Sequence, residues 1–268
     1  MAIPIFFILA ILAVLGDAEY VLYNGEVLMS GQNLTNGPHQ LAMQSDCDLV
    51  LYNNGKPTWR ANIGHKGKNC YLGLKQTGEL VVRRNVHYTL WSSNARSKKG
   101  KYALVLDGSG ALSVLGTRRW SSNNQKEIGR PPAEGEHRPV VETEYVLHSG
   151  QRLTLGRKLV YREYELAFNR CNLVINNTMS GKTLWQTNTK SNGCYLQLEN
   201  NGELALKHVN QRLWSSNKKS DNGVYIAVLR FDGRLAVYGP MLWSNVQNKT
   251  RSDYGHGQGQ IIELPSVL

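Results

Sequence analysis

Several features common in enzymes are absent from the sequence. The chain of 268 residues contains four cysteines and seven histidines, with no Cys-x-x-Cys pair and no Cys/His spacing typical of a zinc site. It also lacks His-Glu-x-x-His and Gly-x-Ser-x-Gly, the patterns of metalloproteases and of serine hydrolases. Carboxylates such as Asp46 and Asp48 lie too close along one segment to flank a glycosidic bond from opposite sides. We therefore expect no metal, no cofactor and no enzymatic activity.

Long apolar runs are also scarce. Residues 1–16 contain no charged side chain, and their length is that of a signal-peptide core rather than of a membrane span. We predict a secretory signal over residues 1–18, no membrane span, and a secreted or vacuolar protein. The sequons at Asn33, Asn176 and Asn248 are then candidates for glycosylation.

The net charge of +11 does not identify a nucleic-acid-binding protein. The basic residues are scattered, and their densest runs lie in segments rich in Ser, Asn and Gly that are typical of exposed turns. A solvated basic surface is the simpler interpretation, and we expect no nucleic-acid partner.

The sequence is a tandem duplication, visible in recurring segments. Ser30-Gly-Gln-Asn-Leu34 recurs as Ser149-Gly-Gln-Arg-Leu153, and Leu90-Trp-Ser-Ser-Asn94 recurs as Leu213-Trp-Ser-Ser-Asn217. The interval from Cys47 to Cys70 equals the interval from Cys171 to Cys194, which predicts one disulfide in each half, Cys47–Cys70 and Cys171–Cys194.

Each half contains a shorter repeat, marked by tryptophan. A short alternating apolar run and a turn precede every one of the six tryptophans, which are Trp59, Trp91, Trp120, Trp185, Trp214 and Trp243. No helical period is sustained beyond the leader, so the repeats predict an all-β protein. Three units per half indicate pseudo-threefold symmetry, with the three tryptophans of each half meeting near the axis to fill its core.

These repeats divide the chain into five parts. We predict a first domain over residues 19–123 and a second over 144–250, behind the signal at 1–18. The polar, proline-bearing stretch 124–143 is interpreted as a linker, exposed and open to cleavage. Residues 251–268 are interpreted as a C-terminal tail or propeptide.

One segment carries the pattern of a binding site. Gln44-x-Asp46-x-Asp48-x-Val50-x-Tyr52, if it forms one strand, places an amide, two carboxylates, one apolar side chain and a phenol on the same face. Such a shallow strip of hydrogen-bonding groups beside an apolar contact suits a sugar.

The segment resembles the Gln-x-Asp-x-Asn-x-Val-x-Tyr signature of the monocot mannose-binding lectins, the snowdrop-type or bulb-lectin family. The resemblance extends to the disulfides, the tryptophan repeat and the tandem halves. It implies two tandem β-prism II domains, each of three antiparallel four-stranded sheets around a pseudo-threefold axis. The Gln-x-Trp repeat of another threefold lectin fold, the β-trefoil, is absent.

The resemblance also assigns roles to side chains. Gln44 and Asp46 would hydrogen-bond the hydroxyls at carbons 2 and 3 of mannose, Tyr52 would reach the hydroxyl at carbon 4, and Val50 would pack on the sugar ring. The departure is Asp48, where the family has Asn. An ionised carboxylate accepts hydrogen bonds but does not donate them, so we expect weakened or altered binding.

The other five candidate strands depart further from the signature. The second segment of the first half carries Lys75, Thr77, Glu79, Val81 and Arg83, and the third carries Asp107, Ser109, Ala111, Ser113 and Leu115. In the second half the segments carry Phe168, Arg170, Asn172, Val174 and Asn176, then Glu199, Asn201, Glu203, Ala205 and Lys207. The last segment keeps Asp232 and Tyr238 alone, a possible remnant site.

The sequence thus predicts a lectin for mannose or mannose-containing glycans and glycoproteins, acting in plant defence or storage. With about one good site per chain, useful avidity requires a homo- or hetero-oligomer, and in the family chains pair by exchanging C-terminal strands, here around Tyr238 to Val246. The alternative is a lectin-fold protein with reduced or lost mannose binding, serving in storage, defence or protein interaction.

Overall fold

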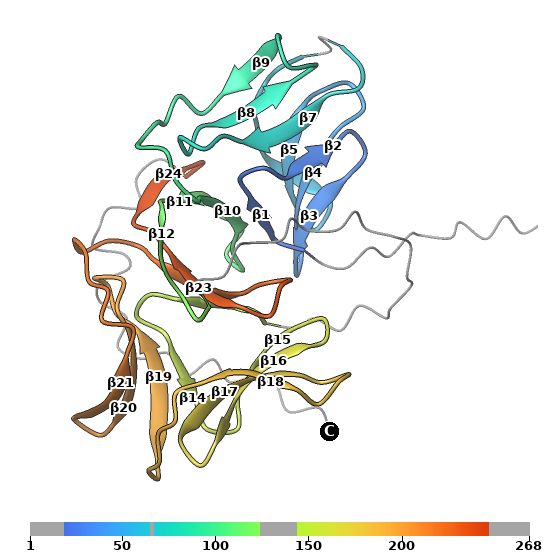
Figure 1. Cartoon of the computed structure of the whole chain (residues 1–268). Helices are drawn as coiled ribbons and strands as arrows, with labels where there is room; N and C mark the ends of the chain where they lie inside the picture. The colour runs from blue at the N-terminus through green and yellow to red at the C-terminus, as the bar shows by residue number, and fades with distance from the viewer. Residues whose placement is uncertain (1–18, 65–66, 124–143, 247–268) are drawn as a thin grey trace, which may run out of the picture.

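The computed structural model describes residues 19–64, 67–123 and 144–246. Within these ranges the chain forms 24 strands and no helix, so no helix there is long enough to cross a membrane. The strands make six four-stranded antiparallel sheets, three in the upper body of Figure 1 and three in the lower. The predicted signal, linker and tail, and the sequon at Asn248, lie outside the described residues.

Two sheets of the upper body come entirely from the first half. One contains β2 (Val27–Met29), β7 (Tyr71–Leu74), β8 (Leu80–Arg83) and β9 (Thr89–Ser92). The other contains β3 (Asn33–Asn36), β4 (His39–Met43), β5 (Leu49–Asn53) and β6 (Lys56–Arg60).

Two sheets of the lower body come entirely from the second half. One contains β14 (Arg152–Thr154), β19 (Cys194–Leu198), β20 (Leu204–His208) and β21 (Gln211–Ser215). The other contains β15 (Leu159–Tyr161), β16 (Tyr164–Asn169), β17 (Asn172–Asn177) and β18 (Thr183–Gln186).

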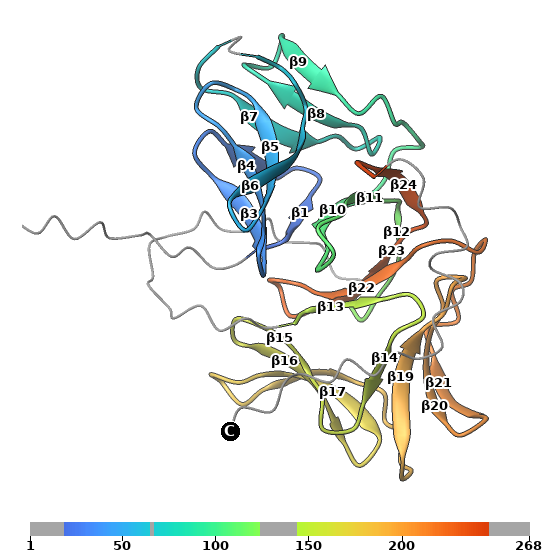
Figure 2. The ribbon, with the colours of Figure 1, turned by 180° about the vertical axis from the view of Figure 1, so that it is seen from behind.

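The two remaining sheets are mixed, because the halves exchange their last strands. The upper mixed sheet contains β1 (Val21–Tyr23), β10 (Ala103–Leu106), β11 (Leu112–Leu115) and, from the second half, β24 (Met241–Ser244). The lower one contains β13 (Val146–His148), β22 (Ile226–Leu229), β23 (Leu235–Tyr238) and, from the first half, β12 (Arg118–Ser121). Both views show β24 beside β11 and β12 beside β23 (Figures 1 and 2).

The exchange corrects the predicted grouping of tryptophans. Trp243 packs edge-on against Trp59 and Trp91, with ring centroids 5.9 to 6.3 Å apart. Trp120 packs in the same way with Trp185 and Trp214, at 5.4 to 5.8 Å. The rings do meet in threes, as predicted, but one ring of each triad comes from the other half. The strand predicted to be exchanged between chains is here exchanged within one chain.

Alternation along the strands builds each core. In the sheet of β3 to β6, Leu34, Leu41 and Leu51 lie opposite one another across neighbouring strands and are almost completely buried, and Trp59 continues the row. Side chains one position away point to the outer face. The outer face is therefore where a polar site is positioned.

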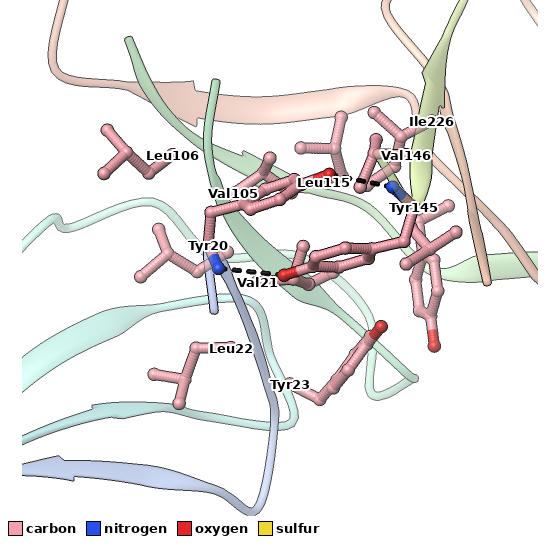
Figure 3. Packing of buried hydrophobic residues seen from close by; sticks show 14 of the residues in the cluster. Tyr20, Val21, Leu22, Tyr23, Val105, Leu106, Leu115, Tyr145, Val146 and Ile226 are labelled. Carbon is pink, nitrogen blue, oxygen red and sulfur yellow. Dashed lines mark hydrogen bonds between the residues drawn. The ribbon is translucent and has the colours of Figure 1, made fainter. Parts of the chain in front are cut away.

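The two bodies are joined by a reciprocal tyrosine pair (Figure 3). The backbone N–H of Tyr20 donates to the hydroxyl of Tyr145 at 2.8 Å, and the N–H of Tyr145 donates to the hydroxyl of Tyr20 at 3.1 Å. The ring centroids lie 4.1 Å apart. Burial raises the pKa of both phenols, so they stay protonated. Buried residues of the two halves thereby form one continuous cluster.

Both predicted disulfides are confirmed. Cys47 is bonded to Cys70 and Cys171 to Cys194, with Cα atoms 5.3 and 5.7 Å apart. Each bridge ties the tip of the hairpin β4–β5 or β16–β17 to the start of β7 or β19, in a neighbouring sheet of the same half. The two hairpin tips are therefore held at corresponding places.

Candidate functional site

The segment from Gln44 to Tyr52 is not one strand, so the prediction of continuous alternation is wrong for its first part. β4 ends at Met43, and β5 begins at Leu49. Between them the N–H of Gln44 donates to the carbonyl of Asp48 at 2.9 Å, and Cys47 takes a left-handed backbone with φ 74°. A disulfide-bonded turn therefore carries the first three residues of the motif, and a strand carries the last two.

The turn nevertheless brings the two ends of the motif together. The Gln44 amide donates through Nε2 to the Tyr52 hydroxyl at 2.6 Å, and both side chains are half-buried. The oxygen of the Gln44 side-chain amide is then available to accept a hydrogen bond, and the Tyr52 hydroxyl keeps its own proton to donate. These two groups form a small polar cluster on the outer face of the sheet.

Asp46 lies beside this cluster at the tip of the hairpin. Its Oδ1 accepts a hydrogen bond from the N–H of Asp48 at 3.0 Å, an Asx turn that fixes the carboxylate's position. Asp46 also lines an open hollow of about 590 Å³, together with Ser30, Ser45, Gly67, Lys68 and Asn69. We refer to this feature as the first-half hollow.

Asp48 is held inside the turn, with 6% of its surface exposed. Its Oδ1 accepts from the backbone N–H groups of Leu49 at 3.0 Å and Ile63 at 3.2 Å. Its Oδ2 lies 3.7 Å from Nη1 of Arg60, which is about half exposed. The carboxylate therefore anchors the backbone, and the guanidinium brings N–H donors to the place where an Asn amide would have supplied one.

Arg60 is the functional candidate that sequence reasoning missed. It follows Trp59 on β6 and pairs with Val50 across the strands, so the two side chains share the outer face. That register was available as a signal once the strand–turn–Trp unit was recognised. Val50 also belongs to this outer face, but its side chain is fully buried in the free protein because neighbouring side chains cover it.

In the sheets β2–β7–β8–β9 and β14–β19–β20–β21, the acidic residue at the third motif position is buried in ion pairs. Glu79 is 2% exposed and accepts from Lys75 Nζ at 2.7 Å, Ser92 Oγ at 2.6 Å and Arg96 Nη2 at 2.9 Å. Burial alone would raise the pKa of this carboxyl, but the hydrogen bonds outweigh burial and lower the pKa to about 2. These groups are engaged with one another rather than facing a ligand.

Glu203 repeats the arrangement in the second half. It is 1% exposed, accepts from the Ser215 hydroxyl, and lies 3.3 Å from Arg212 Nη2 and 3.5 Å from Lys219 Nζ. Glu79 and Glu203 therefore form structural ion pairs at equivalent positions of the two halves.

The remnant pair Asp232 and Tyr238 lies in an internal network where the halves meet. Tyr238 is 1% exposed and accepts a hydrogen bond from the Arg230 guanidinium, which stacks 4.4 Å from the Tyr23 ring centroid. Asp232 lies 3.5 Å from Nε of Arg230 and 3.6 Å from Nε of Arg234. With its phenol enclosed, this pair offers no surface comparable to that of Gln44 and Tyr52.

The hairpin β16–β17 of the second half is one residue shorter than the corresponding hairpin β4–β5 of the first half. Val50 pairs with Ala42, and Val174 pairs with Ala167, so Met43 corresponds to Phe168 and Gln44 to Asn169. Aligning Phe168 with Gln44 is therefore wrong, and Phe168 packs against the core as Met43 does. The residue before the cysteine is Asp46 in one half and Arg170 in the other.

Two of the three predicted glycosylation sequons lie within the described residues. Asn33 is exposed on β3, and Asn176 is half-buried on β17, where its Oδ1 accepts from Thr183 Oγ1 at 2.9 Å. Their glycosylation stays a prediction. Among the described residues, no group of three or more His, Cys, Asp or Glu side chains is placed to hold a metal ion.

Comparison of solved structures gives the class of protein. The chain superposes on the native fetuin-binding agglutinin of Scilla campanulata, a two-domain lectin, with a TM-score of 0.75 and 26% identity, covering 85% of this chain and 100% of that one. The fold is that of a two-domain β-prism II lectin, as the resemblance implied.

Sequence relatives give the family. The chain is 35% identical over 269 residues to mannose-specific lectin 2 of Colocasia esculenta, which covers 95% of this chain and 98% of that protein. It is also 35% identical over 260 residues to mannose-specific lectin 1 of Remusatia vivipara, which covers 92% and 96% of the two chains. No family model matches the sequence. The chain belongs to the monocot mannose-specific lectin family.

Proposed function

We propose that this protein binds mannose and mannose-containing glycans through Gln44, Asp46 and Tyr52, at the tip and the second strand of the hairpin β4–β5. The observation that carries the proposal is the 2.6 Å hydrogen bond between Gln44 and Tyr52, because it assembles the two ends of the motif into one cluster despite the turn. Asp46, fixed by its Asx turn, adds the acceptor that a pair of sugar hydroxyls requires. The specificity named in its relatives agrees with this assignment.

The departure at Asp48 is compensated by Arg60. The carboxylate keeps the acceptor role toward Leu49 and Ile63, while the guanidinium provides donors at the same place. Val50 contacts the sugar ring once the side chains covering it shift. In this arrangement the site is retained with altered chemistry.

The action of the protein depends on multivalency. A shallow monosaccharide site binds at around millimolar strength, roughly 4 kcal/mol, so several sites must act together. Because β24 already completes a sheet of its own chain, homo- or hetero-oligomers form through other surfaces. We also propose a secreted or vacuolar location, on the basis of the apolar leader in the sequence, and a role in defence or storage.

Calorimetric titration of the mature protein with methyl α-mannoside tests the proposal. We expect Gln44→Ala and Asp46→Ala each to reduce affinity at least tenfold, since each removes hydrogen bonds to the sugar. Gln76→Ala, at an exposed amide in the next sheet, is the matched control and should bind as the wild type does. Unchanged affinity in both site variants would exclude this hairpin as the mannose site, and no binding by wild type would favour the reduced-lectin alternative.

A further inference from the structure

A second hollow lies at the equivalent hairpin tip of the second half. It has a volume of about 490 Å³ and is lined by Asn169, Arg170, Thr189 and Lys190. These residues come from the end of β16, from the turn between β16 and β17, and from the segment that follows β18. We refer to it as the second-half hollow; its size is that of a pocket for a small ligand.

Both hollows lie at the tip of the corresponding hairpin, but they differ in the other segments that line them and in charge. Asn169 stands where Gln44 stands in the first half, so an amide is kept. Arg170 stands where Asp46 stands, directly before the bridging cysteine, so a carboxylate is replaced by a guanidinium. Lys190 adds a second cation, and no carboxylate lines this hollow.

The backbone holds Arg170 in an unfavourable conformation. Arg170 and Cys171 have φ of 47° and 63°, and they form the two central residues of a tight turn closed by the pair Asn169 and Asn172. Glycine or asparagine occupies such left-handed positions at lower cost than arginine does. Arg162 and Val209 also adopt left-handed backbones in this chain, so the conformation fixes the position of the Arg170 side chain and does not by itself identify a ligand.

The cations of the second-half hollow are not neutralised by neighbours. Elsewhere on the second half, Lys158 pairs with Glu165 at 2.7 Å, and Lys207 pairs with Glu199. Arg170 and Lys190 make no ion pair with any residue in the described part of the chain. Two exposed cations facing one hollow favour a ligand that carries negative charge.

The neutral groups of the hollow favour a saccharide. The Thr189 hydroxyl donates to the carbonyl of Cys171 at 2.5 Å and lies 2.8 Å from the Thr187 hydroxyl, and its oxygen keeps one lone pair that can accept from a ligand hydroxyl. The Asn169 amide can both donate and accept, as the Gln44 amide does. The combination of two cations, an amide and a hydroxyl matches a sugar with an acidic substituent.

We propose that the second-half hollow binds an acidic saccharide, with Arg170 and Lys190 contacting its carboxylate or sulfate and Asn169 and Thr189 contacting its hydroxyls. This site is separate from the mannose site and acts whether or not that site is active. The protein thereby carries two saccharide sites of different charge preference, one in each half.

Titration of the full-length mature protein tests the proposal at physiological salt. We expect 3′-sialyllactose or galactose 6-sulfate to bind at least tenfold more tightly than lactose or galactose, respectively. The two acidic probes distinguish recognition of a carboxylate from recognition of a sulfate ester. Failure of both to exceed their neutral counterparts would overturn the proposal, as would equal binding of inorganic sulfate or polyglutamate, which would indicate charge attraction alone.

Variants assign the binding to this hollow. Arg170→Asn and Lys190→Gln should each reduce affinity for the acidic probe at least tenfold, and Lys182→Gln, at an exposed lysine beyond the far end of β17, should not change it. Arg170→Asn suits the left-handed position, so its melting temperature should equal or exceed that of the wild type, which separates lost binding from lost folding. Wild-type affinity in both hollow variants would overturn the assignment. Gln44→Ala should leave acidic binding unchanged; a matching loss would instead place the acidic ligand in the first half.

Discussion

The hairpin tips of the two halves differ by one residue. In the first half, Ser45 and Asp46 lie between Gln44 and Cys47, and the tip needs one left-handed residue, Cys47. In the second half, Arg170 alone lies between Asn169 and Cys171, and the shorter turn makes both of its central residues left-handed. One deletion therefore changes the backbone, the charge and the proposed ligand of the tip, while the sheets on either side keep their form.

The two halves are not independent domains, because β24 of the second half completes a sheet of the upper body and β12 of the first half completes a sheet of the lower body. The largest test of this comparison is Trp243→Ala. Removing this ring should cost about 3 kcal/mol of unfolding free energy, as expected for loss of a packed tryptophan. The loss should appear in the first half, where Trp59 and Trp91 lose their partner.

Hydrogen exchange locates that effect. Trp243→Ala should speed exchange in β5 and β8, and the reciprocal variant Trp120→Ala should speed exchange in β17 and β20. If each variant instead loosened its own half of the sequence, the exchange of strands would be contradicted.

Next in size is the buried ion-pair cluster around Glu79. Because its folded pKa of about 2 lies below the ordinary 4.5, the ionised carboxyl stabilises the fold above pH 4.5, and this stabilisation is lost as pH falls toward 2. Chemical denaturation should show Glu79→Gln to be about 2 kcal/mol less stable than wild type at pH 7, allowing for solvent screening of its partners. The difference should shrink toward pH 2.

Glu203→Gln provides the matched measurement in the second half. Its partners Ser215, Arg212 and Lys219 parallel those of Glu79, so we expect a loss of about 2 kcal/mol at pH 7 as well. A stability equal to that of wild type in both variants would mean that these clusters are not structural.

A smaller effect concerns the mannose site. Asp48→Asn keeps an acceptor for Leu49 and Ile63 and adds an amide donor, so affinity for methyl α-mannoside should rise about threefold, or about 0.6 kcal/mol. Arg60→Ala in the wild-type background should lower affinity by a similar factor, since it removes the substitute donor.

The double variant sharpens this assignment. In the Asp48→Asn background, Arg60→Ala should have a smaller effect, because the amide already donates. Lys56→Ala, at the other end of β6, serves as the control for lost positive charge. Strictly additive effects in calorimetry would show that Arg60 does not replace the amide.

An effect of similar size, on stability rather than on binding, is expected at the second tip. Arg170→Gly removes a side chain from a left-handed position and should raise unfolding free energy by about 0.5–1 kcal/mol. Thermal denaturation measures this gain. A decrease in stability would mean that Arg170 is retained for folding rather than for binding.

Much of the fold was predictable because repetition is local. The tryptophans, the apolar triplets and the paired cysteine intervals predict the repeated strands, the meeting of the rings in threes and the disulfides without any long-range information. The exchange of β12 and β24 was not predictable, since both strands end in Trp-Ser and each pairs its tryptophan with a valine of the neighbouring strand.

The sequence was sufficient to select the candidate site residues, but not to predict the backbone that carries them. Alternation correctly placed Val50 and Tyr52, but the Asx turn of Asp46 and the bridge at Cys47 override strand formation before Leu49. The deletion in the second half was hidden by matching the cysteines alone. Matching Leu41-Ala-Met43 to Leu166-Ala-Phe168 would have revealed it.

The reciprocal strands have a consequence for proteolytic maturation. A cut between Asn123 and Glu144 separates β12 from the half it completes and leaves β24 on the other fragment. The two polypeptides would then hold each other as an interlocked heterodimer, co-eluting on size exclusion and parting under denaturant. Neither fragment would refold alone with a complete set of sheets, so processing would yield a two-chain lectin rather than two free domains.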